Sequence, residues 1–293
     1  MKVGALIIDP QNDFVYPGIE NIKDNNIPDD IMNSIKDYMP EHIVKEGSLL
    51  VPGGYDDMVR VAKMIETEGH KFDDIFVTLD THHYLDIAHP VFWMSGDGKT
   101  NPTPFTIITK ADVENGVWRA SIPFFQQHCL DYVTQLEDNG RYPLCIWPVH
   151  CAIGTFGHNV VEPLKVALAL WEKKRKGYVD YVTKGSNFKS EHYSAVKADV
   201  PDPSDSSTNL NHKLITALKE FDIIAIAGEA RSHCVANTIR DIAAEFGDEH
   251  VKKMVLLEDA MSDVPGFENL GNDFMEDMIK LGVKVKTTET LFK

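Results

Sequence analysis

The sequence predicts an α/β fold, a three-layer α/β/α sandwich around a mostly parallel, doubly wound sheet of about six strands. Two observations carry this prediction. Short apolar runs are continuous rather than alternating, which is typical of strands buried on both faces. Segments with helical spacing separate these runs, and a repeated strand–helix–strand order is typical of parallel βαβ units.

The strands are predicted where β-branched and apolar residues gather in short runs. The first is VGALIID at 3–9, a run with no polar residue until its final aspartate. The six expected strands, in chain order, cover residues 3–9, 74–80, 178–184, 221–228, 251–259 and 283–289.

Helices are predicted where apolar residues recur at the spacing of a helix face. In chain order, these segments cover residues 55–69, 158–177, 209–221, 235–247 and 269–282. The polar loop at 200–209 precedes the third of them, and its serine and threonine side chains are candidates to cap that helix. The helices are expected to cover both faces of the sheet.

One region, at about 94–143, departs from this alternation. We interpret it as an insertion, part loop and part short helix (124–140), within a single domain that spans residues 1–293. Because it connects two stretches that contain candidate site residues, we expect it to form part of the rim or lid of a site.

Bulk composition limits the classes of partner. The net charge of −16 disfavours a nucleic-acid or anionic-membrane surface, since phosphate contacts need clustered lysine and arginine. No apolar run is long enough to span a bilayer, and the first residues turn acidic too early for a signal peptide. The four cysteines lack the spacing of a disulfide framework. We therefore expect a cytoplasmic protein with reduced thiols, no nucleic-acid or membrane partner, and a homo-oligomeric state.

Ionisable residues follow four of the predicted strands. These are Asp9, Asp80 with His82, Lys184, and the turn at 228–234. Parallel α/β sheets bind ligands beyond the carboxyl ends of their strands, so the four positions predict one pocket. Each residue also has an ordinary alternative: a turn cap for Asp9, a solvated loop position for Asp80 and a surface amine for Lys184.

Cys234 comes directly after the turn, at the start of a predicted helix. One alternative is a small buried hydrophobe, the usual state of a free cysteine. The other is a nucleophile, because a helix N-terminus favours the thiolate. A neighbouring carboxylate would take the thiol proton, a lysine would hold that carboxylate ionised, and turn amides would form an oxyanion hole.

Three stretches in this order, IIDPQNDF, VTKG and GEARSHCVANTIRDI, resemble the nicotinamidase branch of the isochorismatase-like cysteine hydrolase superfamily. The resemblance covers most of the chain and implies the fold of that superfamily. It also implies a catalytic triad of Asp9, Lys184 and Cys234. A non-catalytic binding protein on this fold would be expected to lack at least one of the three, and all are present.

Two further stretches, LDTHHYLDIAHPVFW and WPVHCAIGTFG, resemble metal-binding segments of the same branch. The resemblance implies that Asp80, His82 and His150 hold one divalent ion, with zinc first and manganese or iron as alternatives; a mixed oxygen and nitrogen ligand set suits these metals. His89 is an additional candidate ligand and His83 a weaker one, the alternative for both being an exposed loop imidazole.

Other positions carry over from the family pattern. Cys151 beside the metal segment is expected to be structural rather than a ligand. Phe14 and Trp147 are expected to enclose a pyridine ring, with simple core packing as the alternative. The backbone N–H groups of Ala230 and Cys234 are the expected oxyanion donors. A cis peptide is implied at Glu229–Ala230, where Glu229 replaces the usual apolar residue.

The resemblance implies amide hydrolysis through a cysteine thioester, with nicotinamide as the leading small-molecule amide substrate. The long 94–143 insertion departs from compact members and leaves pyrazinamide, another heteroaromatic amide or a carbamoyl compound open. An isochorismatase or carbamoyl hydrolase is disfavoured, because these sister enzymes lack the complete metal-ligand set.

Overall fold

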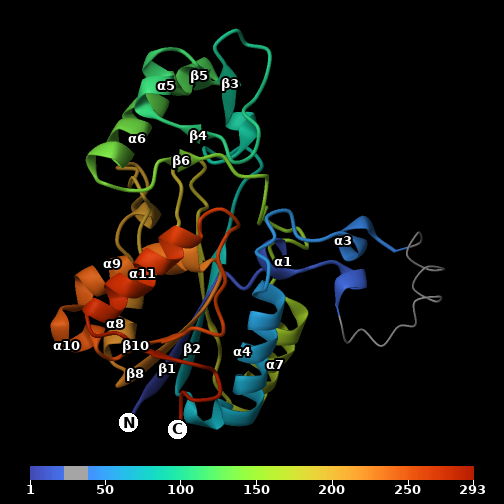
Figure 1. The fold of residues 1–293 in the computed structure, drawn as a ribbon, viewed down its shortest axis with the longest axis vertical. Helices are drawn as coiled ribbons and strands as arrows, with labels where there is room; N and C mark the ends of the chain where they lie inside the picture. Colours follow the sequence, from blue (N-terminus) through green and yellow to red (C-terminus); the bar gives the residue numbers. More distant parts are fainter. Residues whose placement is uncertain (23–38) are drawn as a thin grey trace.

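The computed structural model describes residues 1–22 and 39–293 (Figure 1). Its central sheet has six parallel strands in the order β10-β9-β8-β1-β2-β7. The bounds in chain order are β1 (Val3–Ile8), β2 (Asp74–Asp80), β7 (Asp180–Lys184), β8 (Ile223–Gly228), β9 (Met254–Leu257) and β10 (Lys284–Lys286). All six predicted strands are therefore confirmed, and every residue of β1 is buried, as its continuous apolar run predicts.

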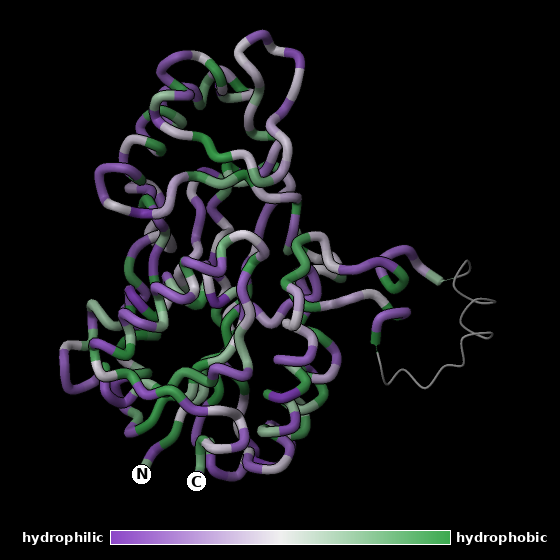
Figure 2. The backbone as a smooth tube through the Cα atoms, in the orientation of Figure 1, coloured by the Kyte–Doolittle hydropathy of each residue, from purple (hydrophilic) through white to green (hydrophobic). Residues whose placement is uncertain are grey.

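Helices cover both faces of this sheet. Figure 1 shows α4 (Gly54–Glu68) and α7 (Glu162–Arg175) side by side on one face. On the other face lie α8 (His212–Lys219), α9 (Ala236–Phe246) and α11 (Glu268–Lys280). Hydrophobic residues follow the central strands and the inner sides of these helices (Figure 2). The predicted three-layer α/β/α sandwich is confirmed.

Shorter elements complete the described part of the chain. The short helices outside the insertion are α1 (Asn12–Val15), η1 (Ile19–Asn21), α3 (Glu41–Val44), η3 (Gly69–Lys71), η4 (Pro90–Phe92), η6 (Ser206–Thr208), η7 (Arg231–Val235) and α10 (Asp248–Val251). The predicted cap of α8 was wrong. Asn211 caps this helix by accepting a hydrogen bond from the Leu214 N–H at 3.0 Å, because it, rather than a residue of the 200–209 loop, directly precedes the first turn.

The insertion is more regular than predicted. It contains, in chain order, β3 (Trp93–Ser95), β4 (Ile107–Ile108), α5 (Lys110–Glu114), β5 (Trp118–Ala120), η5 (Pro123–Phe125), α6 (Gln126–Asp138) and β6 (Leu144–Cys145). β3 pairs with β5 and β4 with β6, both antiparallel. A separate hydrophobic cluster that includes Trp93 and Tyr132 forms its core. In Figure 1 the insertion lies beyond the end of the sheet toward which the strands point.

No helix within the described residues combines the length and the apolar character needed to cross a membrane.

Candidate active site

The ends of four neighbouring strands bring the predicted catalytic residues together. In the sheet order β8-β1-β2-β7, Asp9 directly follows β1, while Asp80 and Lys184 are the last residues of β2 and β7. Cys234 lies in the turn η7 that follows β8. Because these strands are parallel and adjacent, their carboxyl ends place all four side chains at one edge of the sheet.

Lys184 is the centre of this group. Its Nζ lies 2.9 Å from Asp9 Oδ2, 3.0 Å from Asp80 Oδ1 and 3.7 Å from Cys234 Sγ. The ammonium also donates a hydrogen bond to the His192 carbonyl at 2.8 Å. Burial alone would lower the pKa of Lys184, but the Asp80 and Asp9 carboxylates hold that pKa well above its ordinary value. Lys184 is therefore a buried cation that bridges a carboxylate and the thiol.

Asp9 is held by the neighbouring strand. The Thr78 hydroxyl donates to Asp9 Oδ1 at 2.5 Å and accepts from the Asp9 N–H at 3.0 Å. Burial raises the pKa of Asp9, while the Lys184 ammonium opposes that rise. A fixed carboxyl group whose pKa is raised can take up a proton more readily than a solvated one.

Cys234 is buried, and its turn is a short π-helical segment rather than the first turn of an α-helix. Burial raises the pKa of its thiol well above the ordinary value, although Lys184 opposes this effect. Burial therefore opposes the thiolate at the resting site, and the favourable effect expected from the helix terminus stays a prediction. Asp9 lies within hydrogen-bonding reach of the thiol, which gives the proton an acceptor.

Asp80, His82 and His150 form a second, adjacent group. All three are buried, and one ligand atom from each lies within 4.8 Å of the others. Asp80 Oδ2 is 3.1 Å from His82 Nε2 and 3.4 Å from His150 Nε2. One carboxylate oxygen and two imidazole nitrogens around a common centre are a ligand set that suits zinc and neighbouring divalent metals.

The other histidines in this region occupy different positions. His89 is buried, with its Nε2 3.4 Å from His150 Nδ1 and its ring 5.1 Å from that of His82, so it adjoins the three-residue group without being one of its members. His83 is exposed. The Cys151 thiol also lies outside the three-residue group.

Two carboxyl groups that the sequence analysis missed adjoin the metal-binding group. Asp86 Oδ2 lies 3.0 Å from His82 Nδ1, the arrangement in which a carboxylate orients a metal-binding imidazole. Glu191 lies 3% exposed in the pocket, and its Oε2 has no hydrogen-bond partner. Burial raises the pKa of Glu191 to about 8. A polar oxygen left without a partner beside this group is consistent with a site that holds a cation.

An aromatic pocket opens onto Cys234. Its lining includes Phe14, Trp147, Tyr193 and His233, the last two of which the sequence analysis did not predict. The Trp147 Nε1–H donates to the Tyr193 hydroxyl at 2.9 Å, and its ring meets that of His233 edge to face at 5.1 Å. The free space of about 20 Å³ accommodates roughly one water molecule, so a planar ring enters only when the lining side chains move.

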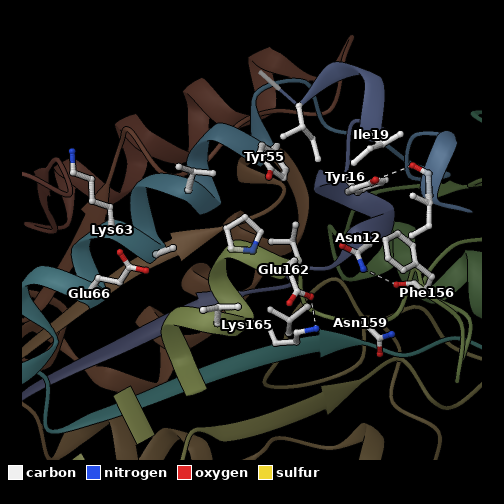
Figure 3. Close-up of a pocket in the computed structure, with 18 residues that line it drawn as sticks. Asn12, Tyr16, Ile19, Tyr55, Lys63, Glu66, Phe156, Asn159, Glu162 and Lys165 are labelled. Carbon is white, nitrogen blue, oxygen red and sulfur yellow. Dashed lines mark hydrogen bonds and ion pairs between the residues drawn. The ribbon is translucent and has the colours of Figure 1, made fainter. Parts of the chain in front are cut away.

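A larger cavity lies elsewhere. It is an open, mostly apolar groove of about 950 Å³ beside α4 and α7, with Tyr55, Lys63 and Glu66 on one wall and Glu162 and Lys165 on the other (Figure 3). It contains none of the predicted catalytic or metal-ligating residues.

Comparison with known proteins supports the fold. No protein-family model matches the chain, and no curated protein matches it in sequence. Solved structures do match. A yeast nicotinamidase is 18% identical with a TM-score of 0.60, covering 97% of this chain and 98% of its own. An Acinetobacter baumanii nicotinamidase and pyrazinamidase is 18% identical with a TM-score of 0.59, covering 99% and 98%. A Pyrococcus horikoshii pyrazinamidase in complex with zinc is 17% identical with a TM-score of 0.51, covering 98% and 99%.

The fold and the site together define a class of α/β proteins in which a buried Asp-Lys-Cys group lies beside an Asp-His-His group. Its fold is the one seen in the yeast and Acinetobacter baumanii structures. The resemblance expected from the sequence is confirmed for the fold.

Proposed function

We propose that this protein is a metal-assisted amidase that hydrolyses nicotinamide to nicotinate and ammonia through a thioester on Cys234. The observation that carries the proposal is the buried Lys184 ammonium, which lies 2.9 Å from the Asp9 carboxylate and 3.7 Å from the Cys234 sulfur. A cation between these two groups stabilises the carboxylate before the proton moves and the thiolate after it has moved. The reaction would belong to pyridine nucleotide salvage.

The proton steps follow from this geometry. Asp9 accepts the Cys234 thiol proton, and the thiolate attacks the carboxamide carbon. Asp9 returns the proton to the departing nitrogen, which leaves as ammonia and leaves the acyl group on sulfur. Water, deprotonated by Asp9, then attacks the thioester, and Asp9 returns this proton to the departing sulfur. The thiol is restored, and the acid product ionises to nicotinate.

The oxyanion of each tetrahedral intermediate would be stabilised by the Ala230 and Cys234 backbone N–H groups. The Ala230 N–H has no acceptor among the described residues. An amide left without a partner in a buried turn is available to a substrate oxygen.

Asp80, His82 and His150 would hold one divalent ion, zinc first and manganese or iron as alternatives, and Glu191 lines the same pocket. When bound, such an ion supplies a Lewis acid suited to a pyridine nitrogen. Asp86 would fix the orientation of the His82 ring. Phe14 and Trp147 would then contact the two faces of the substrate ring.

A related amide such as pyrazinamide is the second candidate substrate. The insertion supports this second candidate, because one of its residues contributes to the pocket wall. The Phe105 ring lies 5.7 Å from that of Trp147. A change of substrate within small heteroaromatic amides leaves the roles of Asp9, Lys184 and Cys234 unchanged.

The test of the nucleophile is a pair of cysteine variants assayed for nicotinate by chromatography. Cys234→Ala should lower turnover by at least about 1,000-fold, since the thioester cannot form. Cys129→Ala is the control, because Cys129 is equally buried but lies in α6 of the insertion. Equal turnover by the two variants would exclude Cys234 as the nucleophile.

A further inference from the structure

Glu229 is a buried acid at the entrance of the nucleophile turn. It follows β8 directly, its side chain is fully buried, and its N–H donates to the Ile8 carbonyl at 2.8 Å. It immediately precedes Ala230, whose N–H is the proposed oxyanion donor. The catalytic steps above do not use its carboxyl group.

Ser262 connects the two sides of Ala230. Its N–H donates to Glu229 Oε2 at 3.0 Å, and its carbonyl accepts from the Arg231 N–H at 2.7 Å. One residue of the loop after β9 therefore binds both neighbours of Ala230. The Glu229 side chain makes one of these two hydrogen bonds, so its loss would leave only the Arg231 side of the turn bound to Ser262.

Asp57, in the first turn of α4, lies against the Glu229 carboxyl group. The Ser262 hydroxyl donates to Asp57 Oδ2 at 2.6 Å, and the Arg60 guanidinium donates to Asp57 Oδ1. Both Asp57 oxygens already accept hydrogen bonds from these donors. Glu229 Oε1 has no hydrogen-bond partner among the described residues, so it is the oxygen of the pair with room for a proton.

The backbone leaves room for this pair. A Cβ atom at Gly54 would lie 3.3 Å from Glu229 Oε1, and one at Gly53 would lie 2.8 Å from the Ser262 hydroxyl. The two glycines at the start of α4 thus let Glu229 and Ser262 approach the helix closely.

We infer that Glu229 is a positioning residue of the amidase, which shares a proton with Asp57 and through Ser262 holds the Ala230 N–H in place for the oxyanion. This inference rests on the proposed function. It predicts that deprotonation of the pair disturbs the turn, since two adjacent buried carboxylates repel each other.

The charged groups around the pair come from three segments. α4 contributes Asp57 and Arg60, the turn after β8 contributes Arg231, and the loop after β9 contributes Asp263, which pairs with Arg231. Burial first, and then the Asp57 carboxylate, raise the pKa of Glu229 well above its ordinary value. The pair therefore keeps its proton to a higher pH than a solvated carboxyl group would.

The experiment compares the unaltered protein with Glu229→Gln and Glu229→Ala by steady-state kinetics across pH, with metal supplied. Glutamine donates to Asp57 and accepts from Ser262 without titrating. The glutamine variant should keep kcat within about threefold of the unaltered protein, and its activity should fall less at alkaline pH. Alanine should lower kcat about 10- to 100-fold with little change in KM, as expected for a displaced transition-state donor. Glu249→Ala, at a residue whose side chain is 88% exposed, is the control.

An infrared measurement makes the test independent of activity and of the folding of the alanine variant. The difference spectrum between the unaltered protein and Glu229→Gln at neutral pH should contain a protonated carboxylic acid band, because Glu191, whose pKa is also raised, contributes equally to both proteins. An unchanged band, or wild-type kcat in Glu229→Ala, would overturn the inference. If the unaltered protein does not hydrolyse nicotinamide, the proposed function fails. The infrared band then decides on its own whether Glu229 holds the proton. Absence of the band contradicts the pairing of Glu229 with Asp57.

Discussion

At the scale of single residues, the site depends on charge compensation around Lys184. One ammonium faces two buried carboxylates, Asp9 and Asp80, within 3.0 Å, and its own side chain is 2% exposed. Bringing any of these charges into the interior is costly unless the others accompany it. The catalytic arrangement and the stability of the sheet edge therefore depend on the same contacts.

Lys184→Met should destabilise the metal-free protein by about 3–5 kcal/mol, because two buried carboxylates lose their counter-ion. It should also abolish amidase activity. Urea denaturation in the presence of a chelator measures the free energy of unfolding. Lys213→Met is the control, since its side chain is 85% exposed, and it should change stability by less than about 0.5 kcal/mol. A loss below about 1 kcal/mol for Lys184→Met would contradict the charge argument.

Residues at strand ends could be predicted from the fold pattern, whereas Trp147 and His150, in the connection after β6, could be predicted only from the family resemblance. Asp9 directly follows β1, and Asp80 and Lys184 are the last residues of β2 and β7, so the parallel sheet places them. Asp86 and Glu191 lie in irregular loops whose path has no periodic signal. The only sequence feature that pointed to Asp86 was its position four residues after His82. The raised pKa of Cys234 could not be predicted, because its main cause is burial, which is not visible in the sequence.

At the scale of elements, the insertion supports the pocket through aromatic contacts, one of which joins Phe105 to Trp147. The Phe105 N–H donates to the Ile146 carbonyl at 2.5 Å, and its ring meets that of Trp147 edge to face. The ring is half-exposed, which places it at the outer side of Trp147. We expect it to restrict the movement of Trp147 more than it affects the reacting atoms.

Phe105→Ala should therefore raise KM about 2- to 10-fold and leave kcat nearly unchanged, as expected for a lost aromatic contact that supports ground-state binding. Steady-state kinetics with nicotinamide measures both constants. Phe124→Ala provides the matched control, because Phe124 lies in the same insertion but is 86% exposed and packs against Phe125. A fall in kcat without a change in KM would place Phe105 in a different role.

The six sheet strands and their covering helices were predictable because each has a continuous or helical pattern of apolar residues. The strands of the insertion were not. They contain only two or three residues each, too few for any periodicity to appear. They form because the insertion buries its own hydrophobic cluster around Trp93 and Tyr132.

At the scale of the whole molecule, buried neutral histidines link stability to pH. His233 is 4% exposed, and burial lowers its pKa to about 4 from the ordinary 6.5. The unfolded chain therefore binds this proton more readily than the folded protein between these values. The resulting stability is present above pH 6.5 and is lost as pH falls through about 4.

His233→Phe should reduce the loss of stability between neutral and acidic pH by about 3 kcal/mol at most, because phenylalanine keeps the ring contacts but cannot be protonated. Urea denaturation at several pH values, with chelator present, measures this difference. His212→Gln, at an exposed position, should follow the unaltered protein. Parallel pH profiles for the unaltered protein and His233→Phe would contradict the assignment.

The most direct test of the central claim is ammonia release from nicotinamide by the purified protein, measured before and after a chelator and again after zinc is restored. Release that stops with the chelator, returns with zinc and is absent in Cys234→Ala is the predicted result. A folded, zinc-loaded protein that releases no ammonia from nicotinamide would contradict the proposed activity.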